Sequence, residues 1–226
     1  MALDRRSSAQ WWDSATDSRT QAINQIRAIL VTAPAVLRER LQPLKRSALI
    51  AACAALRPGL LDGPTAAAKR ALRVLARRVQ SLEEEIAELE VDLDNLTQAV
   101  CPGLRQTFGV GIDGAAILLT AAGDNPERLR SDGAFAALCG VNPLPASSGK
   151  TNRHRLNRGG NRQANAALHR IAVVRLRWHQ QTKAYAAKRT EEGLSKREIL
   201  RCLKRFIARE IFHTLLGRPP VRTAAA

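Results

Sequence analysis

A run of apolar residues at alternating steps of three and four constrains this chain more than any other feature. It fills nine positions: Leu72, Leu75, Val79, Leu82, Ile86, Leu89, Leu93, Leu96 and Val100. Four heptads with apolar a and d positions are typical of a coiled-coil seam. The seam either pairs with a second copy of the chain or packs on another helix of the same chain. The pattern favours the first, so we expect a homo-oligomer through the coiled coil.

Helical spacing on both sides of the seam predicts a mainly all-α protein. Residues 1–18 are a polar N-terminal stretch, and residues 19–64 form a helical segment. Residues 65–101 form the coiled-coil spacer and end at a Cys-Pro-Gly string. Residues 102–216 are expected to form a compact basic helical domain, and residues 217–226 a frayed tail.

Helix-start signals support this division. Thr65 can cap the seam helix, and Asn161 can cap a helix that runs to His179. Ser195 and Glu198 have the spacing of a capping box, which predicts a final helix to about Leu216.

Positive charge is concentrated in the last third of the chain. Lys and Arg number 36 and Asp and Glu 20, a net charge of +16, of which +15 lies in residues 150–226. Arg outnumbers Lys 29 to 7, and Arg makes forked contacts to phosphate that Lys cannot make. Such one-sided charge predicts a polyanionic partner, and DNA is the one we expect. A helical adaptor that binds only protein is the disfavoured alternative.

Several other classes of protein are excluded by the sequence. The most apolar run has about ten residues where a membrane span needs about 20, so no membrane association is expected. Four scattered cysteines without a C-x-x-C pair predict reduced, intracellular thiols. Four scattered histidines show no metal-ligand spacing, so the chain is predicted to have no metal site of its own.

A Gly-Val-Gly string at residues 109–111 leads into a short apolar helix and resembles a helix-hairpin-helix element. Glycines let a backbone approach a phosphate, and amides at a helix start can hold it. Gly109, Val110 and Gly111 are therefore candidate DNA contacts. The alternative is a plain turn between two helices.

A loop of small residues, Ser147-Ser-Gly-Lys150, precedes a cluster of basic residues. A serine can attack a phosphodiester when its hydroxyl is aligned and cations offset the developing charge. The spacing alone is weak evidence, because Ser-Ser-Gly is a common loop string. The basic residues of the cluster are Lys150, Arg153, His154, Arg155 and Arg158.

The string TFGVGIDGAAILLTAAGDNPERLRSDGAFAALCGVNPLPASSGKTNRHRLNRGGNRQANAALHRI resembles the C-terminal domain of insertion-sequence transposases of the IS-one-ten type. The pilin-gene invertase Piv is a relative of that family. The strings RTQAINQIRAILVTAP and SKREILRCLKRFIARE are similar to its members too, so the resemblance spans about residues 19 to 213.

The resemblance implies a nucleophilic serine that forms a covalent link to DNA during transposition. The family serine precedes a glycine, so it maps to Ser148, with Ser147 as the alternative. The family's basic Gly-Asn segment maps to Arg158, Gly159, Gly160 and Asn161. With Arg162 and the cations above, these are the expected nucleic-acid contacts. A guide RNA encoded by the element is a further implied partner, and a bacterial cytoplasmic, nucleoid-associated location is implied as well.

The family also implies an N-terminal RuvC-like domain with four acidic metal ligands. Only 18 residues precede Arg19, and they hold no strand pattern. We therefore expect a truncated transposase, with no cofactor of its own and Mg²⁺ bound only when the acidic domain is present. The alternative is a non-catalytic, dimeric nucleic-acid-binding remnant that modulates a full-length transposase.

Overall fold

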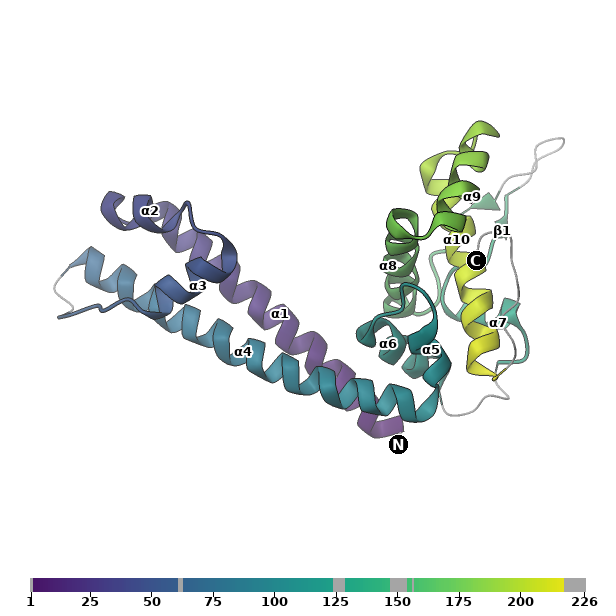
Figure 1. The fold of residues 1–226 in the computed structure, drawn as a ribbon, viewed down its shortest axis with the longest axis horizontal. Coiled ribbons are helices and arrows are strands. Elements are labelled where there is room, and N and C mark those ends of the chain that lie inside the picture. Colours follow the sequence, from purple (N-terminus) through teal and green to yellow (C-terminus); the bar gives the residue numbers. More distant parts are fainter. Residues whose placement is uncertain (1, 61–62, 124–128, 147–153, 156, 218–226) are drawn as a thin grey trace. The chain divides into compact units, whose positions relative to one another are not determined.

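The computed structural model describes residues 2–60, 63–123, 129–146, 154–155 and 157–217, with residues 2–9 as backbone only. The prediction of a mainly α-helical protein is confirmed, because ten helices and one two-stranded sheet make up this part of the chain (Figure 1). The chain divides into two compact units. One unit is Gln10–Val91, and the other is Asp92–Ala226 together with the first nine residues.

The Gln10–Val91 unit is a helical hairpin closed by two short helices. Helix α1 (Ala2–Thr32) lies beside α4 (Pro64–Val100), while α2 (Ala35–Leu41) and α3 (Arg46–Ala54) complete the bundle (Figure 1). Trp12 near the start of α1 donates a hydrogen bond from Nε1 to Glu90 Oε1 (3.4 Å) in the second half of α4. The two long helices are therefore antiparallel.

The first half of the heptad seam packs inside this hairpin. Leu72, Ala76 and Val79 of α4 join one apolar cluster with Ile26 and Leu30 of α1 and with residues of α3. The structure thus has the second arrangement that the sequence left open, in which the seam folds on another helix of the same chain. The d positions Leu75, Leu82 and Leu89 are only half-buried.

Helix α1 begins well before the position that the sequence pattern indicated. The polar stretch before Arg19 is helical from Ala2 onward. It contains neither Gly nor Pro, and its Trp12 and Ala15 continue the three-and-four spacing of Ala22 and Ile26. Ala15 is buried, so packing on α4 stabilises a segment whose composition alone looked unstructured.

The second unit is built around α8 (Arg162–Trp178). It packs on α6 (Ile112–Ala122), α9 (Gln180–Glu191) and α10 (Lys196–Leu215), and α10 also packs on α5 (Pro102–Gln106) and α7 (Asp132–Leu138). Leu118, Leu168, Ile171 and Ile207 are among the buried residues of the shared core. Between α7 and α8, strands β1 (Leu144–Pro145) and β2 (His154–Arg155) form an antiparallel pair.

Two of the three predicted caps are confirmed, and one is wrong. Asn161 Oδ1 accepts from Ala164 N at the start of α8, and Ser195 with Glu198 forms the capping box of α10. Helix α4 begins at Pro64, so Thr65 lies inside it; proline suits the first position because its missing N–H has no helical partner there.

The short sheet and α9 were not anticipated. The chain leaves α8 at His179, which has extended dihedral angles (φ −93°, ψ 116°) but neither Gly nor Pro beside it. Tertiary packing therefore sets this break, and no local sequence signal marks it. Within the described part of the chain, no helix is both long and apolar enough to cross a membrane.

We predict that Leu72→Ala destabilises the hairpin, because Leu72 is fully buried among α1 and α3. The expected loss in free energy of unfolding is about 2–5 kcal/mol. Urea unfolding followed by circular dichroism measures it. Val74→Ala is the matched control, since Val74 is 60% exposed on the same helix, and its change should stay within about 0.5 kcal/mol. Equal losses would contradict the packing described.

Candidate functional site

The candidate site is an arm formed by residues 141–159, between α7 and α8. Its described core is the β1–β2 pair, in which Leu144 faces Arg155 and Pro145 faces His154. The predicted nucleophile Ser148, its alternative Ser147, and the basic residues Lys150 and Arg153 lie outside the described residues. The residues on either side of this loop hold the two ends of the arm together.

The two ends of the arm meet at a pair of glycines. A Cβ on Gly160 would lie 2.5 Å from Gly140 N, and a Cβ on Gly140 would lie 2.3 Å from Gly159 O. Both glycines have positive φ, 82° and 64°, a region that L side chains rarely adopt. The backbones therefore touch without intervening side chains, and Asn161 N donates to Leu138 O (2.7 Å) beside this contact.

Asparagine side chains extend this closure on both sides of the glycine pair. Asn157 Nδ2 donates to Asn142 Oδ1 across the arm (2.5 Å), and Asn157 Oδ1 accepts from Gly159 N (2.8 Å). Asn165 of α8 donates from Nδ2 to the carbonyls of Cys139 (3.0 Å) and Gly140 (2.9 Å). Both strands of the arm base are thus tied together and to α8.

A buried lysine completes this network. Lys204 of α10 donates from Nζ to Asn165 Oδ1 (2.9 Å), and the residue is only 8% exposed. Burial lowers the pKa of Lys204 from its ordinary value, and the charge of Arg201 lowers it further. The lysine orients the Asn165 amide, because an ammonium can only donate and therefore selects the amide oxygen.

Arginines at four-residue intervals line the same helix. Arg197, Arg201, Arg205 and Arg209 recur about every 6 Å along one side of α10. Arg205 and Arg209 both meet Asp132 Oδ2 at the start of α7 (3.0 and 3.1 Å). Burial alone would raise the pKa of Asp132, but the hydrogen bond and charge of Arg205, with Arg209, leave it below the ordinary value.

The predicted binding residues of the arm fall into two groups. His154, Arg155, Arg158 and Arg162 are exposed and can meet a phosphate. Gly159, Gly160 and Asn161 instead have structural roles at the glycine pair and the α8 cap. Their contact with nucleic acid stays a prediction.

The Gly-Val-Gly turn lies at the other end of α8. A Cβ on Gly109 (φ 84°) would contact Ile171 and Arg175 of α8 at 3.4–3.5 Å. Ile171 is about ten residues after Asn161, which corresponds to about 15 Å along the helix. Val110 is buried, and Gly111 precedes α6, where Asp113 pairs with Arg170 (2.8 Å). The structure does not bring this turn to the arm, so the two candidate contacts form separate surfaces.

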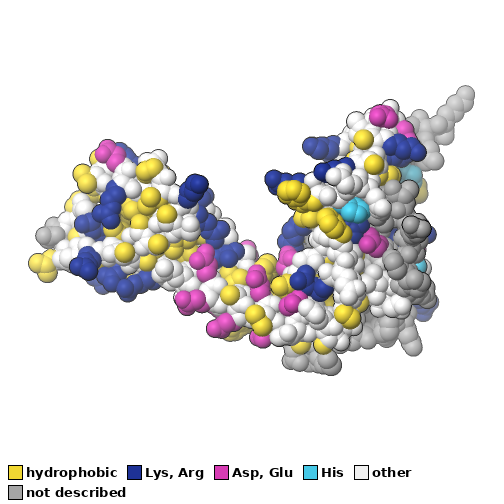
Figure 2. Space-filling view, viewed as in Figure 1, with side chains coloured by type: hydrophobic (Ala, Val, Ile, Leu, Met, Phe, Trp, Pro, Cys, Tyr) yellow, Lys and Arg dark blue, Asp and Glu magenta, His cyan; other side chains and the backbone are white. Residues whose placement is uncertain are grey.

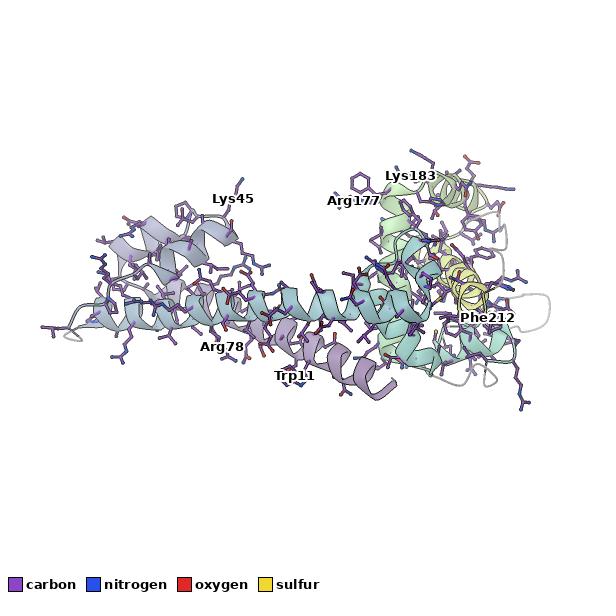
Figure 3. All side chains as sticks on the ribbon, turned by 60° about the horizontal axis from the view of Figure 1, so that its bottom comes forward. Trp11, Lys45, Arg78, Arg177, Lys183 and Phe212 are labelled. Atoms are coloured by element: carbon purple, nitrogen blue, oxygen red, sulfur yellow. The ribbon has the colours of Figure 1, made fainter. Side chains whose placement is uncertain are left out.

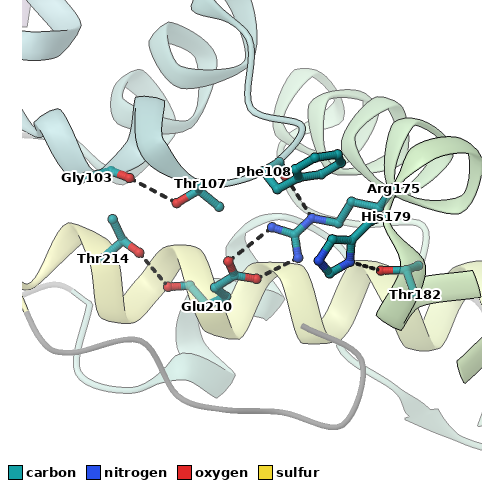
Figure 4. A network of polar contacts seen from close by, with 8 residues as sticks. All are labelled: Gly103, Thr107, Phe108, Arg175, His179, Thr182, Glu210 and Thr214. Atoms are coloured by element: carbon teal, nitrogen blue, oxygen red, sulfur yellow. Dashed lines mark hydrogen bonds and ion pairs between the residues drawn. The ribbon is translucent and has the colours of Figure 1, made fainter. Parts of the chain in front are cut away.

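A buried arginine holds the turn in place (Figure 4). Arg175 is 2% exposed; its Nε donates to Phe108 O (2.9 Å), and its two terminal nitrogens bind the Glu210 carboxylate (2.7 and 3.1 Å). Forked pairing of this kind fixes geometry as well as charge. Burial, and next the charge of Arg175, lower the pKa of neighbouring His179, whereas Glu210 acts in the opposite direction.

Sequence reasoning missed Asn165, Lys204 and Arg175. For Lys204 a signal was available, since it lies on the apolar face of the last helix together with Leu200, Ala208 and Ile211. A lysine at such a position is either unfavourably buried or paired. No comparable signal marks Asn165, whose role depends on the fold of the arm.

Comparison with known families gives a match within the second unit. Residues 101–187 match the model of the Transposase IS116/IS110/IS902 family. These residues are therefore similar to IS110-type transposases. The resemblance found in the sequence is confirmed for residues 101–187, which include the turn, the arm and α8. A search among curated proteins found no match.

The matched segment ends before α10. In the structure α10 nevertheless supplies Lys204 to the arm network and Glu210 to the turn network. The folded domain is therefore longer than the matched segment, and its last helix contacts both candidate surfaces.

We predict that Gly160→Ala is far more destabilising than Gly193→Ala. Both glycines have positive φ, but nothing lies within 4 Å of a Cβ built on Gly193. Both substitutions introduce the same backbone strain, but only Gly160→Ala adds a steric overlap of the new Cβ with backbone atoms. We expect this overlap to lower the free energy of unfolding by about 1–3 kcal/mol more. Urea unfolding of the two variants measures the difference. Equal destabilisation would show that the glycine pair is not a close contact.

A second prediction concerns the pH dependence of Lys204. Since its pKa is lowered in the folded state, the unfolded chain binds more protons below the ordinary value of about 10.5. The unfolding free energy of the wild type relative to Lys204→Met should therefore rise as pH approaches 10.5 from neutrality. Urea unfolding of both proteins at several pH values measures this difference. A difference that falls with pH would contradict a buried lysine.

Proposed function

We propose that this chain binds DNA and contributes Ser148 as the nucleophile for phosphodiester cleavage and rejoining during transposition. The observation that carries the proposal is the glycine pair, which fixes both ends of the arm that contains the serine. The family match of residues 101–187 supports a transposase role. Exposed His154, Arg155 and Arg158 support phosphate binding near the arm.

The proposed reaction is a transesterification. Ser148 Oγ forms a bond to phosphorus, the bond from phosphorus to one sugar oxygen breaks, and that oxygen leaves as a hydroxyl after taking up a proton. The serine hydroxyl loses its proton in the same step, so bonds and charge balance without another reactant. Rejoining reverses the step with a new DNA hydroxyl. Guanidinium groups of the arm offset the negative charge on the phosphoryl oxygens.

A metal ion enters this proposal only through an acidic domain of the RuvC-like kind. Within the described ranges, no three His, Cys, Asp or Glu side chains come together as a metal site would require. Glu83, Glu84, Glu85 and Glu88 are instead spread along the surface of α4.

Two further partners belong to the proposal. The half-buried d positions of α4 and its exposed Val74 and Val91 favour pairing with a second copy. The arginine-rich last third favours an RNA strand as well as DNA, and the family resemblance makes an element-encoded guide RNA the expected one.

We predict that Ser148→Ala abolishes covalent DNA capture and leaves duplex binding within about twofold, because alanine removes only the hydroxyl. The test uses the full chain with a RuvC-like acidic domain supplied in trans and nicked DNA labelled on both strands. Adducts are read on a denaturing gel, and binding by gel shift. Ser147→Ala is the control and should retain capture.

Three outcomes overturn parts of this proposal. Capture that survives in Ser148→Ala but is lost in Ser147→Ala moves the nucleophile by one residue. Capture that survives in both variants refutes a serine nucleophile in this loop. Duplex binding without capture in the wild type leaves a non-catalytic binding module.

A further inference from the structure

Aromatic side chains gather on the surface at the junction of α8 and α9. Trp178 is 64% exposed and Phe108 is 45% exposed, although the chain has only eight Phe, Trp and Tyr residues in all. The Phe108 and His179 rings stack with centroids 5.0 Å apart and an interplanar angle of 35°. Trp178 is the last residue of α8 and directly precedes His179, so it lies at the same junction. We call Phe108, Trp178 and His179 the ring cluster.

The ring cluster is held by the buried arginine network. The carbonyl of Phe108 accepts from Arg175, which Glu210 fixes in turn (Figure 4). Nδ1 of His179 and the buried Thr182 hydroxyl are 2.8 Å apart. Two of the three rings are thereby fixed, so a ligand that stacks on them loses less conformational entropy.

Positive charge surrounds the ring cluster. Arg177 places its guanidinium carbon 5.2 Å from the centre of the Trp178 ring, and both Arg177 and Lys183 are exposed at this end of the domain (Figure 3). Residues 170–190 contain no Asp or Glu. The nearby Glu210 is neutralised by Arg175, and Asp113 by Arg170. Figure 2 shows an exposed apolar patch beside a histidine, with Lys and Arg side chains around it.

We infer that the ring cluster binds unpaired nucleotides of a nucleic-acid strand, with base faces on the rings and phosphates on Arg177 and Lys183. Exposed rings beside cations are the surface that single strands select, because every base has a face that can stack. A duplex cannot offer those faces while its bases stay stacked. A second copy is disfavoured, because it would bring like charges together.

This inference rests on the proposed nucleic-acid binding but not on Ser148. It concerns the turn end of α8, where Gly109 contacts Ile171 and Arg175, and not the arm end. It also gives the Gly-Val-Gly turn a definite task, since the turn positions Phe108 directly before it. Single-stranded DNA and RNA share the required chemistry, and the test below separates them.

Trp178 can report its own occupancy, because the chain has only two other tryptophans, Trp11 and Trp12. In the full chain carrying Trp11→Phe and Trp12→Phe, a 12-nucleotide dT strand or U strand should quench the remaining fluorescence. Fluorescence anisotropy of labelled strands and of a duplex of equal length gives affinities. Trp178→Ala should weaken single-strand binding about tenfold or more and duplex binding less than twofold.

Matched variants separate stacking from charge and from folding. Trp178→Phe should restore most of the single-strand affinity, whereas Trp11→Ala, at a 63% exposed position of the other unit, should change nothing. If Trp178→Ala reduces the affinity for the dT strand more than for the U strand, the bound strand is DNA; the reverse result identifies RNA.

Duplex binding that persists while Trp178→Ala leaves single-strand affinity unchanged overturns this inference alone. Loss of all binding by the wild type overturns the proposed function. If Trp178→Ala converts an oligomer to a monomer and leaves the single-strand affinity unchanged, the ring cluster is a contact between copies of the chain and the inference is wrong.

Discussion

The backbone contact between Gly140 and Gly160 is the constraint on which the candidate site depends. Neither residue can carry a Cβ without meeting backbone atoms of the other strand. An intervening side chain would separate α7 from α8 and move both ends of the arm. Hydrogen bonds then make this steric contact directional: the Asn165 amide donates to the carbonyls of Cys139 and Gly140, and Lys204 donates to the Asn165 side-chain oxygen. The two ends of the arm are thereby held by α7 and α8, and the proposed function needs such support because precise placement of a reacting group depends on a rigid base.

Several acidic residues of this unit are paired with arginines of the same unit. Asp94 binds Arg105, Asp113 binds Arg170, Asp132 binds Arg205 and Arg209, and Glu210 binds Arg175. Carboxylates committed to such pairs do not repel a polyanion at the surface. Among these pairs Arg175–Glu210 is both buried and forked. A buried pair is weak evidence for net stability, and the forked geometry of this one points rather to positioning. The remaining exposed arginines are left to contact phosphate.

Sequence reasoning reached the class of the fold but not the details of the site. The apolar seam, the Asn161 cap and the Ser195 capping box are local signals, and each marks a helix in the structure. The early start of α1 was missed because it depends on packing against α4. The division of α8 from α9 was missed because His179 has no helix-breaking neighbour.

At the site, the sequence could predict cations and glycines but not their partners. Gly159 and Gly160 stood out as possible phosphate contacts, yet only the fold reveals Gly140 opposite them. Arg175 read as one more basic residue of an arginine-rich helix, and its burial follows from tertiary packing with Phe108 and Glu210. The exposed aromatic residues of the ring cluster depend in the same way on a turn and a helix end that are distant in sequence.

Peptide mapping of the covalent protein–DNA adduct tests the central claim most directly. The adduct, formed by the full chain with an acidic domain supplied, is digested and the nucleotide-bearing residue is located by mass spectrometry. The account predicts a nucleotide on Ser148, within the arm that the glycine pair closes. A nucleotide on a residue outside the Ser147–Ser148 pair would contradict it.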